Sequence, residues 1–329
     1  MDELQKIICR EIDSLGKPIS FYRYLELALF HPIHGYYCRS SDRVGHRKDA
    51  DFYTASSLGP LFGQLVLSAI KKLLKNESLL DYQFVEIGVE SGCGISDSWG
   101  EDEFQETFAF GIQDKLELTA QKKVVFSNEL FDAQPFCRFR YLEGEGWREL
   151  GVHHKEGELQ ECLLESFSME GVSVQHRFQE ASTNQYHVDY PVGAEKLLKE
   201  ILDSEWTGLF LAFDYGKAWR SILYESPQGT ARTYQNHQMG IDLLKTPGSL
   251  DITHHICWDH LEEILNENFF RDIKVLRQES FFMNFSLLAI EQIMQNTQKG
   301  IIGGRGTLME LLHPGNMGAK FQVLSGIKT

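Results

Sequence analysis

The first thirty residues carry apolar side chains at helical spacing, in one set between residues 4 and 12 and in a second between residues 21 and 29. Gly16 and Pro18 separate the two sets, and both residue types interrupt helices. The pattern therefore predicts two helices that lead into a turn at HPIHGYY, residues 31–37.

Three short apolar runs further along the chain are typical of parallel strands that are buried on both faces. They are YQFVEIGV, KKVVFSNEL and GLFLAFDYG, at residues 82–89, 122–130 and 208–216. Amphipathic segments predict helices between and beside these strands. The predicted helices start at about Pro60, a residue suited to a first helical turn, and at residues 192 and 258. Strands that alternate with helices predict an α/β fold with a mostly parallel sheet.

A segment of different character lies between the second and third runs. In PFCRFRYLEGEGWRELGV, residues 135–152, apolar residues nearly alternate with polar ones on both sides of EGEG. This pattern predicts an antiparallel hairpin. We therefore expect an N-terminal helical region at residues 1–80 and a sheet domain at residues 81–329, with an insertion at about residues 136–192.

The composition narrows the class of protein. Apolar residues make up 42% of the 329-residue chain and charged residues 24%, which is typical of a folded globular protein. The formal net charge of -15 opposes attraction to nucleic acid or to an anionic membrane. No apolar run approaches the roughly 20 residues that span a bilayer. We therefore expect neither nucleic-acid binding nor membrane insertion.

Cysteine usage and the N-terminus bear on the compartment. The six cysteines are scattered and form no C-x-x-C pair, which favours reduced thiols. The opening MDELQKIICREI is acidic and mixed, unlike a signal or transit peptide. These features predict a cytoplasmic protein. They predict a bacterial protein if no residues were removed from the N-terminus.

Acidic residues follow each of the three predicted strands. They stand in EIGVESG, SNELFDAQP and DYG, at residues 86–92, 127–135 and 214–216. The carboxyl ends of parallel strands meet at one sheet edge, where open α/β sheets bind ligands. A buried carboxylate is costly without a partner. The sequence thus predicts a polar pocket at this edge, although each acid alone is also typical of a turn or a helix cap.

Eight blocks, taken together, resemble the MidA family of class I S-adenosylmethionine-dependent methyltransferases. The blocks are GYY (35–37), DFYTAS (51–56), VEIG (85–88), SNELFDAQP (127–135), FDYG (213–216), GTARTYQNH (229–237), PGSLDITHHI (247–256) and MGAKFQVL (317–324). They occur in the family's order over almost the whole chain. The family includes the mitochondrial arginine methyltransferase that helps to assemble respiratory complex I.

The resemblance implies a Rossmann-like class I methyltransferase sheet with an N-terminal helical extension and an inserted hairpin, or substrate, subdomain. It implies positions that bind the cofactor S-adenosylmethionine at Asp51, Phe52, Thr54, Glu86, Gly88, Gly92, Asn128 and Glu129. It implies catalytic positions on the acceptor side at Asp214, His237, Asp251, Thr253 and His254. Methyl transfer from a sulfonium to a guanidinium needs in-line alignment and a carboxylate that holds and polarises the nucleophile.

Two positions depart from the family's pattern on the cofactor side. Glu90 stands where the family's first loop has its middle glycine, and its side chain either turns away or fills space near the cofactor. Gly111 stands where the family has an acid that binds the two ribose hydroxyls. Gln113 and Asp114 are candidate substitutes for that acid.

A further strand is expected in FAFGIQDKLEL (108–118), between the first two apolar runs. The segments before and after this strand are short. They are CGISDSWGEDEFQET (93–107), which shows poor helical periodicity, and DKLELTAQKK (114–123). A parallel crossover normally has a dozen or more residues, including a helix. The cofactor half of the sheet is therefore expected to be reduced, and the acceptor half to be intact.

Histidines gather in HPIHGYYC and DITHHICWDH, residues 31–38 and 251–260. A closed zinc site needs four ligands with supporting contacts, and adjacent histidines point in different directions. We therefore expect packing rather than a metal site. The chain also lacks the G-x-S-x-G turn of hydrolases and the phosphate-binding loop.

Two functions remain open. One is an S-adenosylmethionine-dependent methyltransferase acting on a protein side chain, with arginine as a candidate. The other is a catalytically inactive relative that serves as a binding or assembly factor. The retained blocks favour the enzyme, whereas Glu90, Gly111 and the short connections favour the alternative. Either function predicts a protein substrate or partner, and the oligomeric state stays open.

Overall fold

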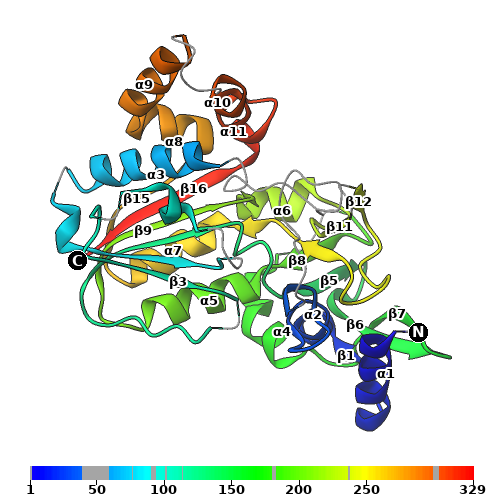
Figure 1. Ribbon diagram of the computed structural model, residues 1–329. Helices are drawn as coiled ribbons and strands as arrows, with labels where there is room; N and C mark the ends of the chain where they lie inside the picture. The colour runs from blue at the N-terminus through cyan, green and yellow to red at the C-terminus, as the bar shows by residue number, and fades with distance from the viewer. Residues whose placement is uncertain are drawn as a thin grey trace.

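The computed structural model describes residues 2–38, 59–75, 77–89, 94–100, 102–112, 114–179, 183–235, 238–298 and 304–329. Within these ranges, a six-stranded sheet in the order β15-β16-β9-β4-β2-β3 forms the centre of the molecule (Figure 1). Its strands are β2 (Gln83–Ile87), β3 (Glu106–Phe110), β4 (Lys122–Asn128), β9 (Thr207–Asp214), β15 (Phe270–Arg277) and β16 (Gln322–Lys328). The first four run parallel, and β16 is antiparallel to both β9 and β15. The predicted parallel strands are confirmed.

Helices cover both faces of this sheet, as expected for an α/β fold (Figure 1). One face carries α3 (Pro60–Leu73), α8 (Gln278–Phe285), α9 (Leu287–Gln298), α10 (Arg305–Leu312) and α11 (Met317–Lys320). The other carries α5 (Val192–Leu202) and α7 (Trp258–Glu267). Successive residues of a strand point to opposite faces of the sheet. Phe126 packs in the hydrophobic core on the α3 face, and Val125 packs in the one on the α5 face. This alternation explains why β4 and β9 have consecutive apolar residues in their central parts.

The predicted hairpin belongs to a second sheet, ordered β1-β6-β5-β8 with β7 paired to β6. Its strands are β1 (Ile19–Ser20), β5 (Cys137–Leu142), β6 (Gly146–Lys155), β7 (Glu158–Leu163) and β8 (His187–Tyr190). Tyr141 of β5 lies opposite Trp147 of β6 in an antiparallel pair, which confirms the hairpin. Gly144 and Gly146 have φ angles of 82° and 80°, so EGEG supplies glycines where the turn needs positive φ.

The two predicted N-terminal helices, α1 (Glu3–Leu15) and α2 (Phe21–Phe30), contact the second sheet. Asp2 caps α1 by accepting a hydrogen bond of 2.7 Å from the N–H of Gln5, and Gly16 ends the helix with a φ of 62°. Both helices are confirmed. Helix α3, which also precedes residue 80, packs on the central sheet instead, and the division of the chain at residue 80 remains a proposal.

Short elements lie outside the two large sheets. They are α4 (Met169–Val174), α6 (Trp219–Glu225), β10 (Gly216–Lys217), β11 (Arg232–Gln235), β12 (Gln238–Gly240), β13 (Asp251–Thr253) and β14 (Ile256–Cys257). Strand β11 lies between β12 and β13 in a small antiparallel sheet. Strands of two to four residues are too short for a hydrophobic pattern to predict. None of the helices within the described ranges has the length and hydropathy of a membrane span.

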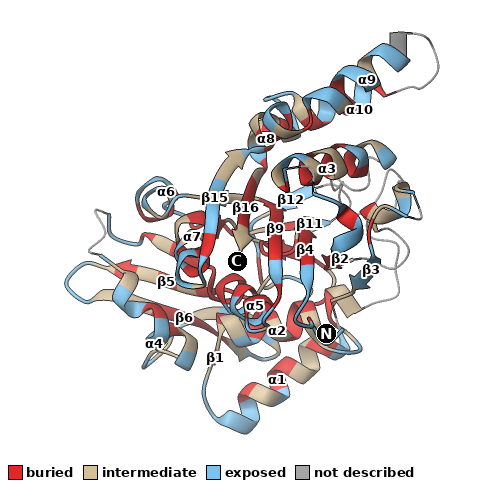
Figure 2. Cartoon of the chain, turned by 90° about the vertical axis from the view of Figure 1, so that its left-hand side faces the viewer, coloured by how far each residue is buried: buried red, intermediate tan, exposed pale blue. Residues whose placement is uncertain are grey.

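The connections on both sides of β3 are short, as the sequence predicted. Between β2 and β3 the described residues form a 3-10 helix, η4 (Ile95–Ser98), and between β3 and β4 they form no helix. Strand β2 nevertheless runs parallel to both neighbours. Four of the five residues of β3 are exposed and the fifth is half-buried, so the sheet has an open edge on this side (Figure 2).

Candidate active site

The carboxyl ends of β2, β4 and β9 lie side by side at one edge of the central sheet. Ile87 is paired with Ser127, and Asn128 is paired with Phe213, so the residues that follow these strands share this edge. Strand β3 lies on one side of β2, and β4 lies on the other. Open α/β sheets bind ligands where the strand order reverses in this way.

Asp214, at the end of β9, is fully buried and binds the turn that follows β4. Its Oδ2 accepts hydrogen bonds from the N–H groups of Phe131 at 2.8 Å, Leu130 at 3.2 Å and Asp132 at 3.4 Å. Its Oδ1 accepts one from Tyr215 at 2.8 Å. These four backbone donors occupy both carboxylate oxygens, so the geometry gives Asp214 the task of holding this turn.

Asp132, a residue that sequence reasoning missed, lies beside Asp214. Burial raises the pKa of Asp132 well above its ordinary value, and the Asp214 carboxylate raises it further. Burial also raises the pKa of Asp214, but its four backbone hydrogen bonds oppose this rise. The two carboxyl groups therefore titrate as a pair rather than independently. The only signal in the sequence is the position of Asp132 inside the SNELFDAQP block.

Tyrosines and further carboxylates gather around this pair. The hydroxyl of Tyr37 donates a 2.6 Å hydrogen bond to Asp251, and Tyr234 of β11 is paired with Asp251 of β13. Burial raises the pKa of Tyr215, and so does the nearby charge of Asp132. We define the acceptor cluster as Tyr37, Glu129, Asp132, Tyr215, Tyr234 and Asp251. Its three tyrosines were not singled out from the sequence.

Glu129 joins β4 to the turn that Asp214 holds. Its φ angle is 51°, which is uncommon for a residue that carries a side chain. Its N–H donates to the carbonyl of Phe213 at 2.9 Å, and its carboxylate accepts from the side chain of Asn128 at 3.3 Å. Disfavoured backbone conformations of this kind cluster at functional sites. Its charge also raises the pKa of Asp132, which places it in the cluster.

Thr253 and His254 lie at the end of β13. Thr253 is half-buried and pairs with Arg232 in the small sheet. The N–H of His254 donates to the carbonyl of Asp132 at 3.1 Å, and its ring lies 4.8 Å from that of Phe136. Burial lowers the pKa of His254 to about 4, so the ring is neutral at neutral pH. His254 thus touches the acceptor cluster through its backbone.

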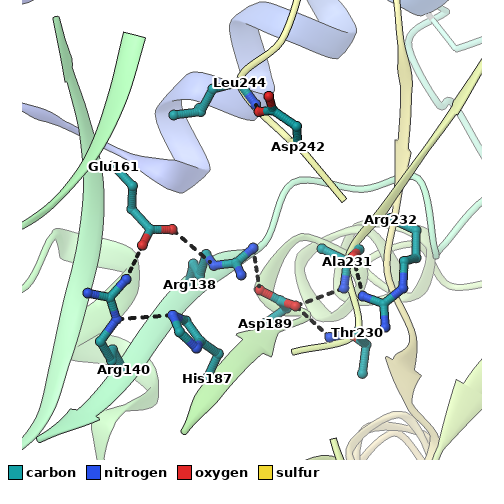
Figure 3. Close-up of polar contacts among 10 residues, drawn as sticks. All are labelled: Arg138, Arg140, Glu161, His187, Asp189, Thr230, Ala231, Arg232, Asp242 and Leu244. Atoms are coloured by element: carbon teal, nitrogen blue, oxygen red, sulfur yellow. Dashed lines mark hydrogen bonds and ion pairs between the residues drawn. The ribbon is translucent and has the colours of Figure 1, made fainter. Parts of the chain in front are cut away.

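A buried aspartate of the second sheet holds the strand that carries Tyr234. Asp189 of β8 accepts hydrogen bonds from the N–H groups of Thr230 at 2.6 Å and Ala231 at 2.8 Å, immediately before β11 (Figure 3). The guanidinium of Arg138 lies 3.5 Å from its other oxygen, a distance that allows an ion pair but not a good hydrogen bond. The second sheet therefore contributes to the position of the acceptor cluster, which the sequence did not indicate.

On the cofactor side, Gly88 and Glu86 shape the turn after β2. Gly88 has a φ of 85°, and a Cβ atom there would lie 2.8 Å from the Leu130 side chain, so only glycine fits. The carboxylate of Glu86 accepts hydrogen bonds of 2.9 and 3.3 Å from the N–H of Ile95. Burial raises the pKa of Glu86 to about 7.

Two buried polar atoms at the end of β4, Ser127 Oγ and Asn128 Oδ1, have no hydrogen-bond partner in the described part of the chain. Buried polar groups normally bind a partner. Together with the turn at Gly88, which lies at the same sheet edge, they fit a polar cofactor with hydroxyl and amino groups. The sequence assigned Asn128 and Gly88 to the cofactor, and their positions are compatible with that expectation.

Several residues named from the sequence lie outside the described ranges. They are Asp51, Phe52, Thr54, Glu90, Gly92, Gln113 and His237. Gly111 and Asp114 are described: the Asp114 carboxylate accepts a 2.6 Å hydrogen bond from the N–H of Gly111. Position 111, where the resemblance implies an acid, is thus a glycine whose N–H binds a nearby carboxylate.

The other candidate sites contribute nothing at this edge. Within the described residues, no group of three or more His, Cys, Asp or Glu side chains is arranged to hold a metal ion. His260 lies 3.1 Å from the polar atoms of both Tyr190 and Glu195. Two surface hollows lie elsewhere, one beside α7 and the start of β15 and the other beside the residues that precede β2.

Comparisons with known proteins bear on this site. The sequence pattern of a family described as "Putative S-adenosyl-L-methionine-dependent methyltransferase" matches residues 62–274, more than half of the chain. "Protein arginine methyltransferase NDUFAF7, mitochondrial" of Danio rerio is 22% identical, over 95% of this chain and 84% of its own. A Burkholderia thailandensis protein crystallised with S-adenosyl-homocysteine has a TM-score of 0.84 at 21% identity, covering 98% of this chain and 91% of that one. A second crystal structure from that organism covers the same shares with a TM-score of 0.82 and 21% identity. The Rossmann-like methyltransferase fold is therefore confirmed.

Proposed function

Because the chain belongs to a family of S-adenosyl-L-methionine-dependent methyltransferases, we propose that it methylates a protein, at the guanidinium group of an arginine. The match over residues 62–274 carries the reaction class and the cofactor. The acceptor cluster is the observation that supports a guanidinium acceptor. The name of the Danio rerio relative, a protein arginine methyltransferase, agrees with this choice.

The acceptor cluster combines carboxylates with tyrosine rings, a set suited to a planar cation. Carboxylates such as Asp251 and Glu129 accept paired hydrogen bonds from a guanidinium, and aromatic faces attract cations. A guanidinium beside a sulfonium brings two positive charges together. Nearby carboxylates offset that repulsion and favour the arrangement in which the methyl group is transferred.

The cofactor, when bound, supplies a methyl group on a positively charged sulfur. Ser127, Asn128 and the turn at Gly88 would hold it at the carboxyl ends of β2 and β4. Glu129 or Asp251 would accept the proton that the guanidinium nitrogen loses as its N–C bond forms and the bond between the methyl group and sulfur breaks. An N–H would thereby be replaced by an N–CH3, and S-adenosylhomocysteine would be the leaving group. Asp214 keeps the turn after β4 in place, which aligns these carboxylates with the acceptor.

The protein acceptor is expected to present a basic segment, because the formal net charge of -15 attracts positive partners. We also propose a bacterial cytoplasmic location. This is supported by the free cysteines of the described ranges, Cys9, Cys38, Cys137, Cys162 and Cys257. Fractionation of cells that express the protein at native level tests the location, and recovery in another compartment would overturn it.

Two measurements test the function. Calorimetric titration of S-adenosylmethionine and S-adenosylhomocysteine into the purified full chain tests cofactor binding. Transfer of labelled methyl groups to arginine-containing peptides, with lysine-substituted peptides as controls, tests the acceptor. Absence of binding at millimolar ligand would contradict the enzyme and favour the inactive binding or assembly factor. Equal labelling of the lysine peptides would contradict arginine.

The variant Asp251→Asn tests the role of the carboxylate charge in the acceptor cluster. Because the amide keeps the shape of the side chain but not its charge, we expect transfer to arginine peptides to fall at least about 100-fold, the order expected for a group that stabilises transition-state charge. The affinity for S-adenosylhomocysteine is expected to stay within about twofold of wild type. An unchanged transfer rate would show that Asp251 does not act on the methyl acceptor.

A further inference from the structure

The carboxylate of Asp114 lies against Gly111, just after β3. Its Oδ2 accepts a 2.6 Å hydrogen bond from the N–H of Gly111. A Cβ atom built on Gly111 would lie 3.3 Å from the same Oδ2 and 3.5 Å from the carbonyl oxygen of Val89. The Asp114 carboxylate is therefore a direct neighbour of position 111, at the end of β3.

This position borders the glycine turn after β2. Gly88 and Val89 both donate hydrogen bonds to the carbonyl of Phe110, at 2.8 and 3.1 Å, so the turn is tied to the end of β3. In Rossmann-like sheets, a carboxylate at the end of the strand beside the glycine turn binds ribose hydroxyls. Strand β3 is that strand here, and it ends in Phe110, Gly111 and Ile112, none of which is acidic.

We propose that Asp114 binds the ribose diol of the cofactor's adenosine, taking the place of an acid at position 111. The inference rests on the proposed function, because it assumes that an adenosine cofactor binds at this edge. The N–H of Gly111 uses one of about four lone-pair positions of the carboxylate, which leaves capacity for two hydroxyl donors. Asp114 is exposed to solvent, so a ligand can reach it.

Gly111 is explained by the same arrangement. It does not adopt a positive φ angle, unlike Gly88, so its backbone conformation does not require glycine. A Cβ atom at this position would be in tight contact with the Asp114 carboxylate, at 3.3 Å. The acid therefore stands at position 114 rather than at position 111. Placing an acid at position 111 and removing the one at position 114 is a direct test.

The test is calorimetric titration of S-adenosylhomocysteine and of its 2′,3′-dideoxy analogue into the full chain. The key variant is Asp114→Asn, whose side-chain oxygen can still accept the Gly111 hydrogen bond and preserve the turn. We expect it to bind S-adenosylhomocysteine about 10- to 100-fold more weakly than wild type, the loss expected for hydrogen bonds to a charged group. The dideoxy analogue is expected to bind both proteins equally.

Two further variants sharpen the result. Glu117→Gln removes another exposed acid of this segment, one paired with Lys115 at 2.8 Å, and is expected to leave both affinities unchanged. The double variant Gly111→Asp with Asp114→Ala returns the acid to position 111, where the remaining contact of a Cβ atom, 3.5 Å to Val89, is an ordinary one. It is expected to bind S-adenosylhomocysteine more tightly than Asp114→Ala alone.

The outcomes separate this inference from the proposed function. Equal binding of S-adenosylhomocysteine by wild type and Asp114→Asn would overturn the role of Asp114 and leave the function standing. An equal loss for both ligands would also overturn it, since Asp114 would then only shape the turn. Wild-type protein that binds neither S-adenosylmethionine nor S-adenosylhomocysteine would overturn both.

Discussion

Gly88 and Gly16 adopt similar left-handed backbone conformations, with φ angles of 85° and 62°, but only Gly88 packs against another side chain. We expect Gly16→Ala to lower the free energy of unfolding by about 1 kcal/mol, the cost of the backbone conformation alone. Gly88→Ala is expected to cost about 1–3 kcal/mol more, because its Cβ would press on Leu130. Denaturant unfolding of both variants measures the difference, and equal losses would contradict the packing argument.

Single residues also show where sequence reasoning reached its limit. Asp214 follows a strand that the hydrophobic pattern predicts, so its place at the sheet edge was foreseeable. Its four backbone hydrogen bonds were not, because their donors lie more than eighty residues earlier, except for Tyr215. Asp132 was missed for the same reason: its raised pKa depends on burial and on the nearby charge of Asp214, and both arise only when the chain folds.

At the scale of elements, β8 and β11 belong to different sheets and are joined through Asp189. We expect Asp189→Asn to lower the free energy of unfolding by about 2–4 kcal/mol, since a fully buried charge that binds two backbone N–H groups is lost. Hydrogen exchange of the amides of Thr230 and Ala231 is expected to accelerate. Because β11 carries Tyr234, the acceptor cluster is expected to become less rigid when β11 is no longer held by Asp189.

The matched control is Glu161→Gln in the same network (Figure 3). Glu161 pairs with Arg138 and Arg140, but its side chain is 27% exposed. Partly exposed ion pairs contribute little, so we expect a loss below about 1 kcal/mol. Equal effects of the two variants on exchange at Thr230 would show that the whole network, rather than Asp189, holds the strand.

Elements differ in how far the sequence predicts them. Strand β4 was predictable because both of its faces are buried, which makes its central residues, Val124 to Phe126, consecutively apolar. The hairpin of β5 and β6 was predictable from alternation and from the EGEG turn. Strands β11 and β13 were not, since three or four residues carry no periodic signal. Yet these two strands bring Tyr234 beside Asp251.

At the scale of the whole molecule, buried acids make stability depend on pH. Burial raises the pKa of Glu86 to about 7, so between pH of about 4 and 7 the folded protein binds more protons than the unfolded chain. The stabilisation of the folded protein that comes from this extra proton binding is fully present below about pH 4. It is lost as the pH rises through about 7.

Glu86→Gln isolates the effect, because its amide oxygen can still accept the hydrogen bond of Ile95. Between pH 5 and pH 8, we expect the wild type to lose about 1–3 kcal/mol more of its free energy of unfolding than the variant does. Denaturant unfolding at several pH values measures both curves. Parallel curves would mean that Glu86 keeps an ordinary pKa in the folded protein.

The sequence by itself determined the α/β class, the strands and helices of the central sheet, the inserted hairpin and the family, because these depend on local periodicity and on the order of short blocks. It also predicted the short connections on both sides of β3, which the structure shows within the described residues. Folding alone brought Tyr37, Asp132 and Tyr234 together with Asp251, and placed Asp114 over Gly111. Such contacts arise from packing, turn geometry and charges of residues that are separated along the chain or hidden within turns, and no periodic pattern in the sequence records them.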